Sequence, residues 1–543
     1  MVFARRSTTL LAAIIASCAM VLSLTACTSD NKTVVDGQTT VTSNSAGGVA
    51  VFTPSDGITL NQQMPLNKWA KLVPDLAKAL ADAGFKKGDI DHTTSDSLAK
   101  QSRAIQDFVV DHLSNNTTDD SGIAIAPDNM TLLVAPVVEA DASTRQYGDY
   151  VSQNLSTNDV TDEGATSDGE SSEDDSSKDD SSNTESDSTA SDEQAQAVDR
   201  LVSSLKLAKE SGMHVVLLGN SIEGYKPDAF VKFSDAQTIG KLQAEKMVSK
   251  LKLDKASKDN PKYIEVLLPY TAMDEKGNAN DSTFAQEAFR GIWQVLGSYY
   301  QKGVVESPSG TLDGKSTEND WQAVAYDAAK EGSTAKVLDK RLAKTDGQST
   351  LTRIDGIITM NDYIASEVVK ELDDLGYTGS AADINPQITI SGIVGNITGK
   401  KDLSRDAVPD PIKSPENDNA NDSSSSDDDA DKDTSASDKD RDSQWPLVTG
   451  YGAYVSNIPS IVNGKQWMTG MEDRQTIATD IAQACAKLNK DEALNSMPSI
   501  RNSEVGGVKK IPTISEPLLA VSASNLKSAL IDPGYISLAD AGL

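Results

Sequence analysis

The 543-residue chain has few of the residues on which catalysis usually depends. It contains three histidines and three cysteines, and the histidines lack the spacing of metal ligands. It has no Gly-x-Ser-x-Gly, Cys-x-x-Cys or His-Glu-x-x-His motif and no glycine-rich phosphate loop. With so few histidines, a Ser-His or Cys-His pair would be hard to assemble. We therefore expect a protein that is not an enzyme and uses no cofactor and no metal.

Positive charge is also scarce, with 50 basic residues against 81 acidic ones and a net charge of −31. Proteins that bind nucleic acid need Lys and Arg to displace counterions, so this partner is disfavoured. The acidic excess is concentrated, however. Residues 159–193 hold 14 acidic residues and one basic residue, and residues 416–442 hold 11 and three. The charge therefore belongs mainly to two segments and not to the fold.

Around these acidic runs, residues 141–195 and 400–444 are rich in Ser, Asp, Asn and Glu and poor in aromatic side chains. Such segments bury too little apolar surface to offset the entropy lost on ordering. We predict that both are disordered insertions. A calcium loop is an alternative for Asp431-Lys432-Asp433, but Ala436 stands where an EF-hand needs glycine.

The N-terminus has the features of an export signal. Arg5 and Arg6 precede an apolar stretch that closes on Leu24-Thr25-Ala26-Cys27, which resembles a bacterial lipobox. We predict a lipoprotein signal peptide at 1–26, lipidation of Cys27, and a flexible tether at 27–46. The protein would then sit on the extracytoplasmic face of the bacterial cell membrane. The alternatives are an ordinary signal peptide or an uncleaved anchor helix.

Beyond the tether, apolar strands alternate with helices. Strands are expected at 48–52, 131–135, 214–218, 263–268 and 354–358, and their near-continuous apolar runs are typical of parallel sheets covered on both faces. A helix from Trp69 places Leu72, Leu76 and Leu80 on one face and ends at Gly84. This alternation predicts doubly wound α/β lobes.

Parallel sheets bind ligands beyond the carboxyl ends of their strands. Four predicted strand–helix junctions carry polar residues there, namely Asn220, Asp235, Asn361-Asp362 and Tyr451. An Asn amide both donates and accepts, and an ionised Asp accepts several hydrogen bonds, which suits vicinal hydroxyls. The alternative for each residue is a helix cap or a turn, and for Asp362 an N-cap.

Two tryptophans are candidates for stacking on a sugar ring. Trp69 lies in a first helical turn and Trp321 follows a polar run, and for both we leave ligand stacking and core packing open. Trp293 and Cys485 lie in apolar helical patterns, so we expect both to be buried.

Several motifs together resemble the type I periplasmic binding proteins of ABC sugar importers, and among them the branch that binds xylose and multiple monosaccharides. The motifs are Gln101-x(4)-Gln106, Leu133-Val134-Ala135-Pro136, Asp235-x(4)-Gly240-x(2)-Gln243-Ala244, Asp355-Gly356-x(4)-Asn361-Asp362, Thr449-Gly450 and Trp467-Met468-Thr469.

The resemblance implies two α/β lobes joined by a three-segment hinge. Lobe 1 would comprise 46–233 plus 470–507, lobe 2 would comprise 234–469, and 508–543 would form a C-terminal crossing segment. By motif, the side chains of Asp235, Asn361 and Asp362 would bind hydroxyls.

The chain also departs from the pattern of this branch. Asn220 replaces an Asp-Arg pair, Gly450-Tyr451-Gly452-Ala453 replaces Gly-Gln-Asp-Ala, and Phe284 replaces an Asn. The implied protein is a monomeric, lipid-anchored solute-binding protein that delivers a sugar-like ligand to an ABC permease. The alternatives are a sensory or interaction lipoprotein that binds another small polar ligand or a protein, and an extracellular enzyme.

Overall fold

The computed structural model describes residues 46–55, 65–115, 126–138, 144–151, 153–156, 185–273, 280–343, 351–382 and 445–543, and the structural statements below concern these residues. The chain divides into residues 1–44 and 45–543, and every described residue belongs to the second unit. Cys27 and the predicted signal peptide and tether therefore lie outside the described residues. No described helix is long and apolar enough to cross a membrane.

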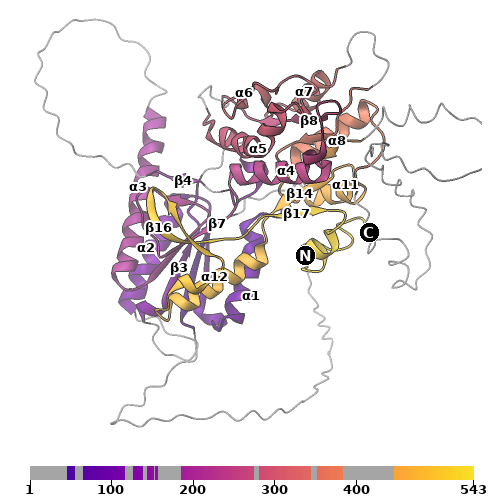
Figure 1. Cartoon of the computed structure of the whole chain (residues 1–543). Coiled ribbons are helices and arrows are strands. Elements are labelled where there is room, and N and C mark those ends of the chain that lie inside the picture. The colour runs from indigo at the N-terminus through magenta and orange to yellow at the C-terminus, as the bar shows by residue number, and fades with distance from the viewer. Residues whose placement is uncertain are drawn as a thin grey trace, which may run out of the picture. The chain divides into compact units, whose positions relative to one another are not determined.

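Five strands from the N-terminal part of the chain and two from its C-terminal part, β15 and β16, build a seven-stranded sheet in the order β15-β16-β7-β5-β3-β1-β2 (Figure 1). All neighbouring strands are parallel except the β15–β16 hairpin. The bounds are β1 (Gly48–Pro54), β2 (Ile90–Ser95), β3 (Met130–Val134), β5 (His214–Leu218), β7 (Ala229–Lys232), β15 (Ile500–Val505) and β16 (Val508–Ser515).

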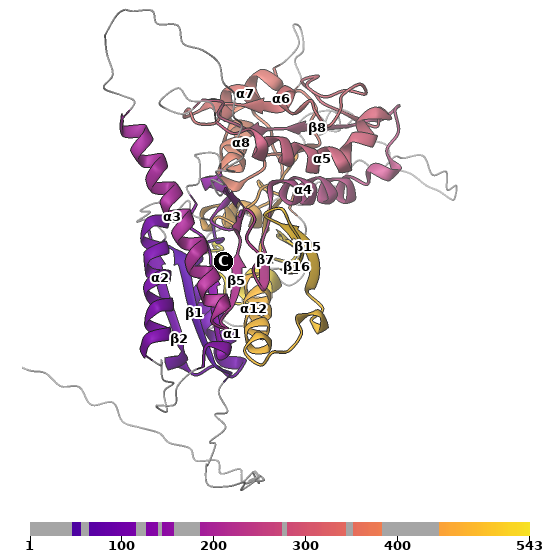
Figure 2. The same ribbon diagram turned by 90° about the vertical axis from the view of Figure 1, so that its left-hand side faces the viewer.

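Helices cover both faces of this sheet. On one face, α1 (Trp69–Asp82) and α12 (Arg474–Leu488) share an apolar core with strand residues such as Val51 and Val216. On the other face, α2 (Leu98–Asn115) and α3 (Glu185–Glu210) pack against Ala50 and Val215, the residues that precede Val51 and Val216 in their strands. Figure 2 shows these two helices beside β1 and β2. The alternation of strand side chains between two cores explains the continuous apolar runs in the sequence. We call this sheet and its helices the first lobe.

A second sheet, in the order β10-β8-β12-β13, is parallel throughout. Ile358 faces α4 and α5, whereas its neighbour Ile357 faces α7 and α8. We call this sheet and its helices the second lobe. The elements are β8 (Lys262–Val266), β10 (Val305–Glu306), β12 (Gly356–Ile358), β13 (Leu447–Val448), α4 (Ala236–Leu251), α5 (Thr283–Gln301), α7 (Ser333–Arg341) and α8 (Asp362–Asp374).

Short elements complete the described chain. Three two-stranded sheets pair β14 (Met468–Met471) with β17 (Leu519–Ser522), β9 (Leu268–Pro269) with β11 (Ala325–Tyr326), and β4 (Asn154–Leu155) with β6 (Ser221–Ile222). The short helices are η1 (Lys87–Asp89), η2 (Pro127–Asn129), η3 (Arg145–Tyr147), η4 (Leu253–Lys255), α6 (Trp321–Val324), η5 (Val455–Asn457), α11 (Ile458–Val462), η6 (Leu494–Ser496) and η7 (Lys527–Ile531).

Within the described residues the chain passes between the lobes three times. It leaves the first sheet after β7 to enter α4, returns from β14 to α12, and leaves again from β16 to β17, which pairs with β14. The α/β class with parallel sheets is confirmed. The predicted boundary at 508 is wrong, because β16 continues the first sheet beside β7 and the crossing begins only after Ser515.

The predicted disordered insertion at 141–195 is also wrong at its ends. Residues 145–147 form η3, residues 154–155 form β4, and α3 begins at Glu185. The first turns of α3 carry the acidic residues Glu185, Asp187 and Asp192, which are favoured near a helix N-terminus, and residues 193–197 (Glu-Gln-Ala-Gln-Ala) are good helix formers. The rest of this insertion, at 141–143, 152 and 157–184, and the whole insertion at 400–444 lie outside the described residues.

Candidate functional site

Asn361 stands at the carboxyl end of β12 and caps the N-terminus of α8. Its Oδ1 accepts a hydrogen bond of 2.9 Å from the backbone N–H of Ile364. The cap predicted for Asp362 is therefore supplied by Asn361, one residue earlier. The other end of the amide remains available to a partner outside the helix, and its Nδ2 donates to Oε1 of Gln146 at 3.1 Å. Asn361 thus joins a helix of the second lobe to a residue that follows β3.

Asp362 is fully buried and its carboxylate is surrounded by donors of its own chain. Oδ2 accepts from the N–H of Tyr454 and the hydroxyl of Thr469, both at 2.9 Å, and Oδ1 accepts from Nε2 of Gln466 at 2.7 Å. Burial raises the pKa of Asp362 to about 6, although these hydrogen bonds oppose the rise. A Cβ on Gly450 would lie 2.1 Å from Oδ1, so only glycine fits beside the carboxylate. Asp362 therefore organises the 450–469 loop.

Asp235 caps α4, as the alternative interpretation of its position predicts. Its Oδ1 accepts from the N–H and the hydroxyl of Thr238, at 2.7 and 2.6 Å, and its Oδ2 pairs with Nζ of Lys232 at 2.7 Å. Burial alone would raise the pKa of Asp235, but the hydrogen bonds from Lys232 and Thr238 lower it below its ordinary value. The carboxylate is charged and already holds three partners.

Asn220 connects loops at the carboxyl end of the first sheet. Its Nδ2 donates to the carbonyl of Pro136 at 2.9 Å and its Oδ1 accepts from the N–H of Gln153 at 3.0 Å. Both ends of the amide are thus used by backbone groups, and the side chain is nearly buried. In this structure Asn220 fixes the loops that follow β3 and β5.

Tyr451 lies where two crossing segments meet. It is fully buried, and its hydroxyl contacts Oγ of Ser234 and donates to Glu472 at 3.3 Å. Glu472 also accepts from the N–H of Ser234 at 2.6 Å, and burial raises its pKa to about 7. Ser234 belongs to the first crossing and Glu472 to the second, so this cluster joins them. The sequence analysis missed Glu472, whose only signal is a carboxylate directly after an apolar strand.

Both candidate tryptophans pack in apolar cores. Trp69 is 2% exposed and meets the rings of Tyr150 and Phe233 edge-on, at centroid distances of 5.1 and 5.7 Å. Trp321 is 9% exposed and lies edge-on to Tyr270 at 5.2 Å. Of the two interpretations left open, packing describes both rings here. The expected burial of Trp293 and of Cys485 is confirmed.

A segment that the sequence analysis did not nominate, residues 144–151, contacts several of these site residues. The ring of Tyr147 lies 4.7 Å from that of Phe284 and 6.2 Å from that of Tyr451. The carbonyl of Gln146 accepts from the hydroxyl of Tyr454 at 2.7 Å. The sequence contains no motif that marks these residues. Their composition does not separate them from the acidic run that follows, so residues 141–195 are predicted as one insertion.

The same segment is held to the first lobe by its other residues. Asp149 pairs with Nζ of Lys68 at 2.7 Å and accepts from the N–H of Trp69 at 3.0 Å. The hydroxyl of Tyr150 donates to the carbonyl of Lys68 at 2.5 Å. Segment 144–151 therefore presents Gln146 and Tyr147 to the second lobe and Asp149 and Tyr150 to the first.

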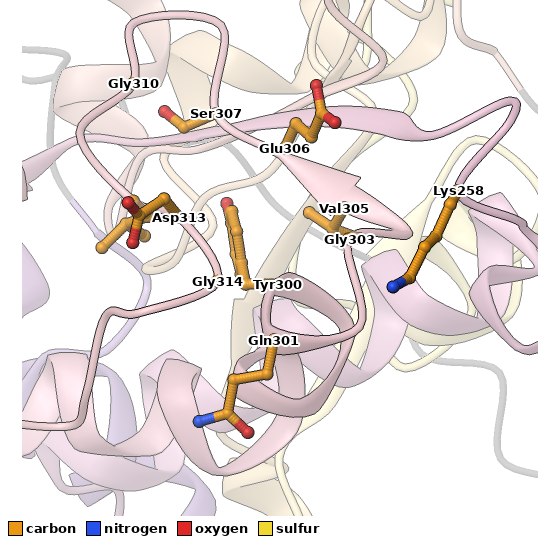
Figure 3. Close-up of a pocket in the computed structure, with 11 residues that line it drawn as sticks. Lys258, Tyr300, Gln301, Gly303, Val305, Glu306, Ser307, Gly310, Asp313 and Gly314 are labelled. Atoms are coloured by element: carbon orange, nitrogen blue, oxygen red, sulfur yellow. The ribbon is translucent and has the colours of Figure 1, made fainter.

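Two pockets in the described residues lie away from the candidate site residues and from segment 144–151. One, of about 420 Å³, lies beside β10, with Lys258 on one side and Asp313 on the other and Tyr300 between them (Figure 3). The other, of about 470 Å³, is lined by His214, Asp228 and the loop after α12. Neither contains a predicted site residue, and the described residues hold no group of three or more His, Cys, Asp or Glu placed to bind a metal ion.

No family model matches the chain, and no curated protein matches it. Among solved structures, it is similar to an ABC transporter solute-binding protein from Clostridium phytofermentans with bound β-D-glucose (17% identity, TM-score 0.44, 91% of this chain and 99% of the other). It is also similar to a carbohydrate transporter solute-binding protein from Chloroflexus aurantiacus in complex with D-glucose (18%, 0.43, 92% and 98%) and to the arabinose-binding protein AraP from Geobacillus stearothermophilus (10%, 0.41, 89% and 99%). The xylose and multiple-monosaccharide branch stays a prediction.

Proposed function

We propose that this chain is an extracytoplasmic, lipid-anchored solute-binding protein, which captures a sugar-like solute between its two lobes and delivers it to an ABC permease. The observation that carries the proposal is the position of Asn361. This residue caps α8 at the carboxyl end of β12 and directs its amide N–H toward Gln146, in the segment that follows β3. That is where parallel α/β sheets bind their ligands.

The surroundings of Asn361 suit a hydroxylated ring. Its amide can donate to one hydroxyl. The rings of Phe284 and Tyr451 both contact the ring of Tyr147, the neighbour of Gln146, and would line an apolar wall there. Three crossing segments allow a hinge motion whose equilibrium a bound solute would bias toward closure. Nothing in this mechanism requires a covalent step.

A sensory or interaction lipoprotein is the second candidate. It is favoured by the extent to which Asp235 and Asp362 are already bonded to their own chain. A site with so few available carboxylate oxygens would suit a ligand that needs fewer charged contacts than a monosaccharide.

Calorimetry and thermal unfolding with a panel of pentoses, hexoses and oligosaccharides test the proposal. We expect one sugar to raise the melting temperature, because a ligand at about 100 times its Kd stabilises the folded state by about 2.7 kcal/mol. Asn361→Ala should weaken that sugar at least about tenfold, since a hydrogen bond contributes roughly 0.5–1.5 kcal/mol and its loss leaves a buried partner unsatisfied. The exposed Asn502→Ala serves as the control. If Asn361→Ala and Asn502→Ala bind the sugar alike, Asn361 does not belong to the solute site and the proposal loses the observation that carries it.

A further inference from the structure

Gln146 and Tyr147 contact the same groups that a solute would use, namely the amide of Asn361 and the ring of Phe284. The Gln146 side chain accepts from the amide of Asn361, and its carbonyl accepts from the hydroxyl of Tyr454. The Tyr147 ring is 1% exposed and belongs to the apolar core of the second lobe, against Phe284 and Tyr451. A solute could not use the same donors and the same wall while these side chains remain in place.

We propose that segment 144–151 is a tethered internal ligand, in which Gln146 and Tyr147 occupy the solute site until a solute displaces them. The inference rests on the proposed function, because it assigns a competitor to the same site. It also specifies the chemistry of that site. The positions now filled by Gln146 and Tyr147 accept a hydrogen-bond acceptor facing Asn361 and a flat ring facing Phe284.

The remainder of the segment holds these two residues in position. Gly148 has a positive φ of +95 degrees, and a Cβ on it would lie 2.5 Å from the carbonyl oxygen of Asn67. A side chain at this position is excluded both by conformation and by space. Asp149 and Tyr150 then fasten the chain to Lys68. The turn at Gly148 therefore fixes the position from which the chain extends to Tyr147 in the second lobe.

The opposite end of the segment supports the same arrangement. Val151 is buried in the apolar core of the second lobe, beside Tyr147, whereas Tyr150 between them lies in the core of the first lobe and stacks on Phe233 at 4.8 Å. Consecutive residues thus enter two different cores. This is a clamp between the lobes and not a loop lying on one of them.

Tethering makes such an occupant an effective competitor. A segment attached near its site acts at an effective concentration of roughly millimolar order. If it fills the site in about 99 of 100 molecules, the apparent affinity for a free solute falls about 100-fold. A sugar panel run on the unmodified protein would then underestimate the affinity of the site itself.

The test compares the full chain with the double variant Gln146→Ala/Tyr147→Ala. The control is Tyr225→Ala, which removes another buried tyrosine, in the first lobe and outside this site. Hydrogen–deuterium exchange without solute should rise at residues 361–365 and 451–454 in the double variant and not in the control. D-glucose, D-xylose, D-ribose and L-arabinose are then titrated, and we expect the double variant to bind one of them at least about tenfold more tightly than the unmodified chain.

The two readouts separate this inference from the proposed function. Unchanged exchange at 361–365, or equal sugar affinity in the unmodified chain and the double variant, overturns the internal ligand. Increased exchange with no sugar bound by either protein supports the internal ligand and excludes the sugar-binding function. Should the double variant fail to fold, Gln146→Leu decides, because it keeps a side chain of similar size and removes the amide whose oxygen accepts from Asn361.

Discussion

At the scale of single residues, the buried carboxyl of Glu472 couples the cluster at the lobe crossings to pH. Burial raises its pKa to about 7, with the nearby charge of Asp235 adding to the rise, while hydrogen bonds from Ser234 and Tyr451 oppose it. Its ordinary pKa is 4.5. The folded protein therefore holds this proton more tightly than the unfolded chain does, so stability from this group is complete below pH 4.5 and falls as the pH rises toward 7.

Replacing Glu472 by Gln should reduce that pH dependence. A shift of this size corresponds to on the order of 2–3 kcal/mol between pH 5 and pH 8. We expect the free energy of unfolding of the unmodified protein to be lower at pH 8 than at pH 5 by this contribution, and Glu472→Gln to lose most of the difference. Urea unfolding at both pH values measures it. The exposed Glu504→Gln should keep the full difference, and a matching loss in that control would contradict the assignment.

Asp362 contributes with the same sign over a lower range of pH, because its pKa is raised to about 6. Its position after a predicted strand is evident from the sequence, but its role is not. The donors that surround it come from Tyr454, Gln466 and Thr469, about a hundred residues further along the chain. The spacing within one motif cannot show such distant partners. The sequence therefore predicts that Asp362 binds a ligand, whereas in the structure its carboxylate accepts hydrogen bonds from residues 454–469.

At the scale of elements, the sequence predicts strands better than the loops between them. Apolar runs such as 214–218 are buried on both faces of a sheet, and this pattern depends only on neighbouring residues. Segment 144–151 does not stand out in the sequence, because it is adjacent to an acidic run that dominates the composition of residues 141–195. The burial of Tyr147 and Tyr150 depends on contacts with distant elements. Local sequence does not encode those contacts.

A buried ion pair joins two elements of the second lobe. Glu265 on β8 is fully buried and accepts from Nη1 of Arg341, on α7, at 3.1 Å, and from the hydroxyls of Ser307 and Ser309 at 2.9 and 2.8 Å. The guanidinium also donates to the carbonyl of Val324. Removing one partner of such a pair leaves an uncompensated charge in a site without water access.

Arg341→Met should therefore destabilise the protein by roughly 3–5 kcal/mol, because it retains the aliphatic bulk and removes the charge that Glu265 needs. Lys100→Met is the matched control, since the ion pair of Lys100 with Asp96 is exposed and should contribute less than about 1 kcal/mol. Chemical denaturation of both variants provides the comparison. Equal and small losses would show that Glu265 is satisfied by the serine hydroxyls alone.

At the scale of the whole molecule, the acidic excess bears on solubility and the N-terminus on attachment to the membrane. About two thirds of the −31 charge lies in two segments of the sequence and the remaining third in the rest of the chain. A net charge carried in this way keeps a protein soluble near a surface and does not determine its fold. The proposed function then requires that the chain be held at the membrane, and the sequence analysis predicts that a lipid on Cys27 holds it there.

Cys27→Ser should release the protein from the membrane. A diacylated cysteine adds about 0.8 kcal/mol of membrane affinity per buried CH₂, and two chains are needed for stable anchoring, so loss of the thiol removes the whole contribution. Membrane fractionation of cells that express the full chain, with mass spectrometry of the N-terminus, measures the change. Cys485→Ala is the matched control, because that thiol is fully buried in the first lobe and cannot reach a lipid. If mass spectrometry finds the N-terminus of the unmodified chain uncleaved and Cys27 without a lipid, the lipid anchor is excluded and an uncleaved signal helix takes its place.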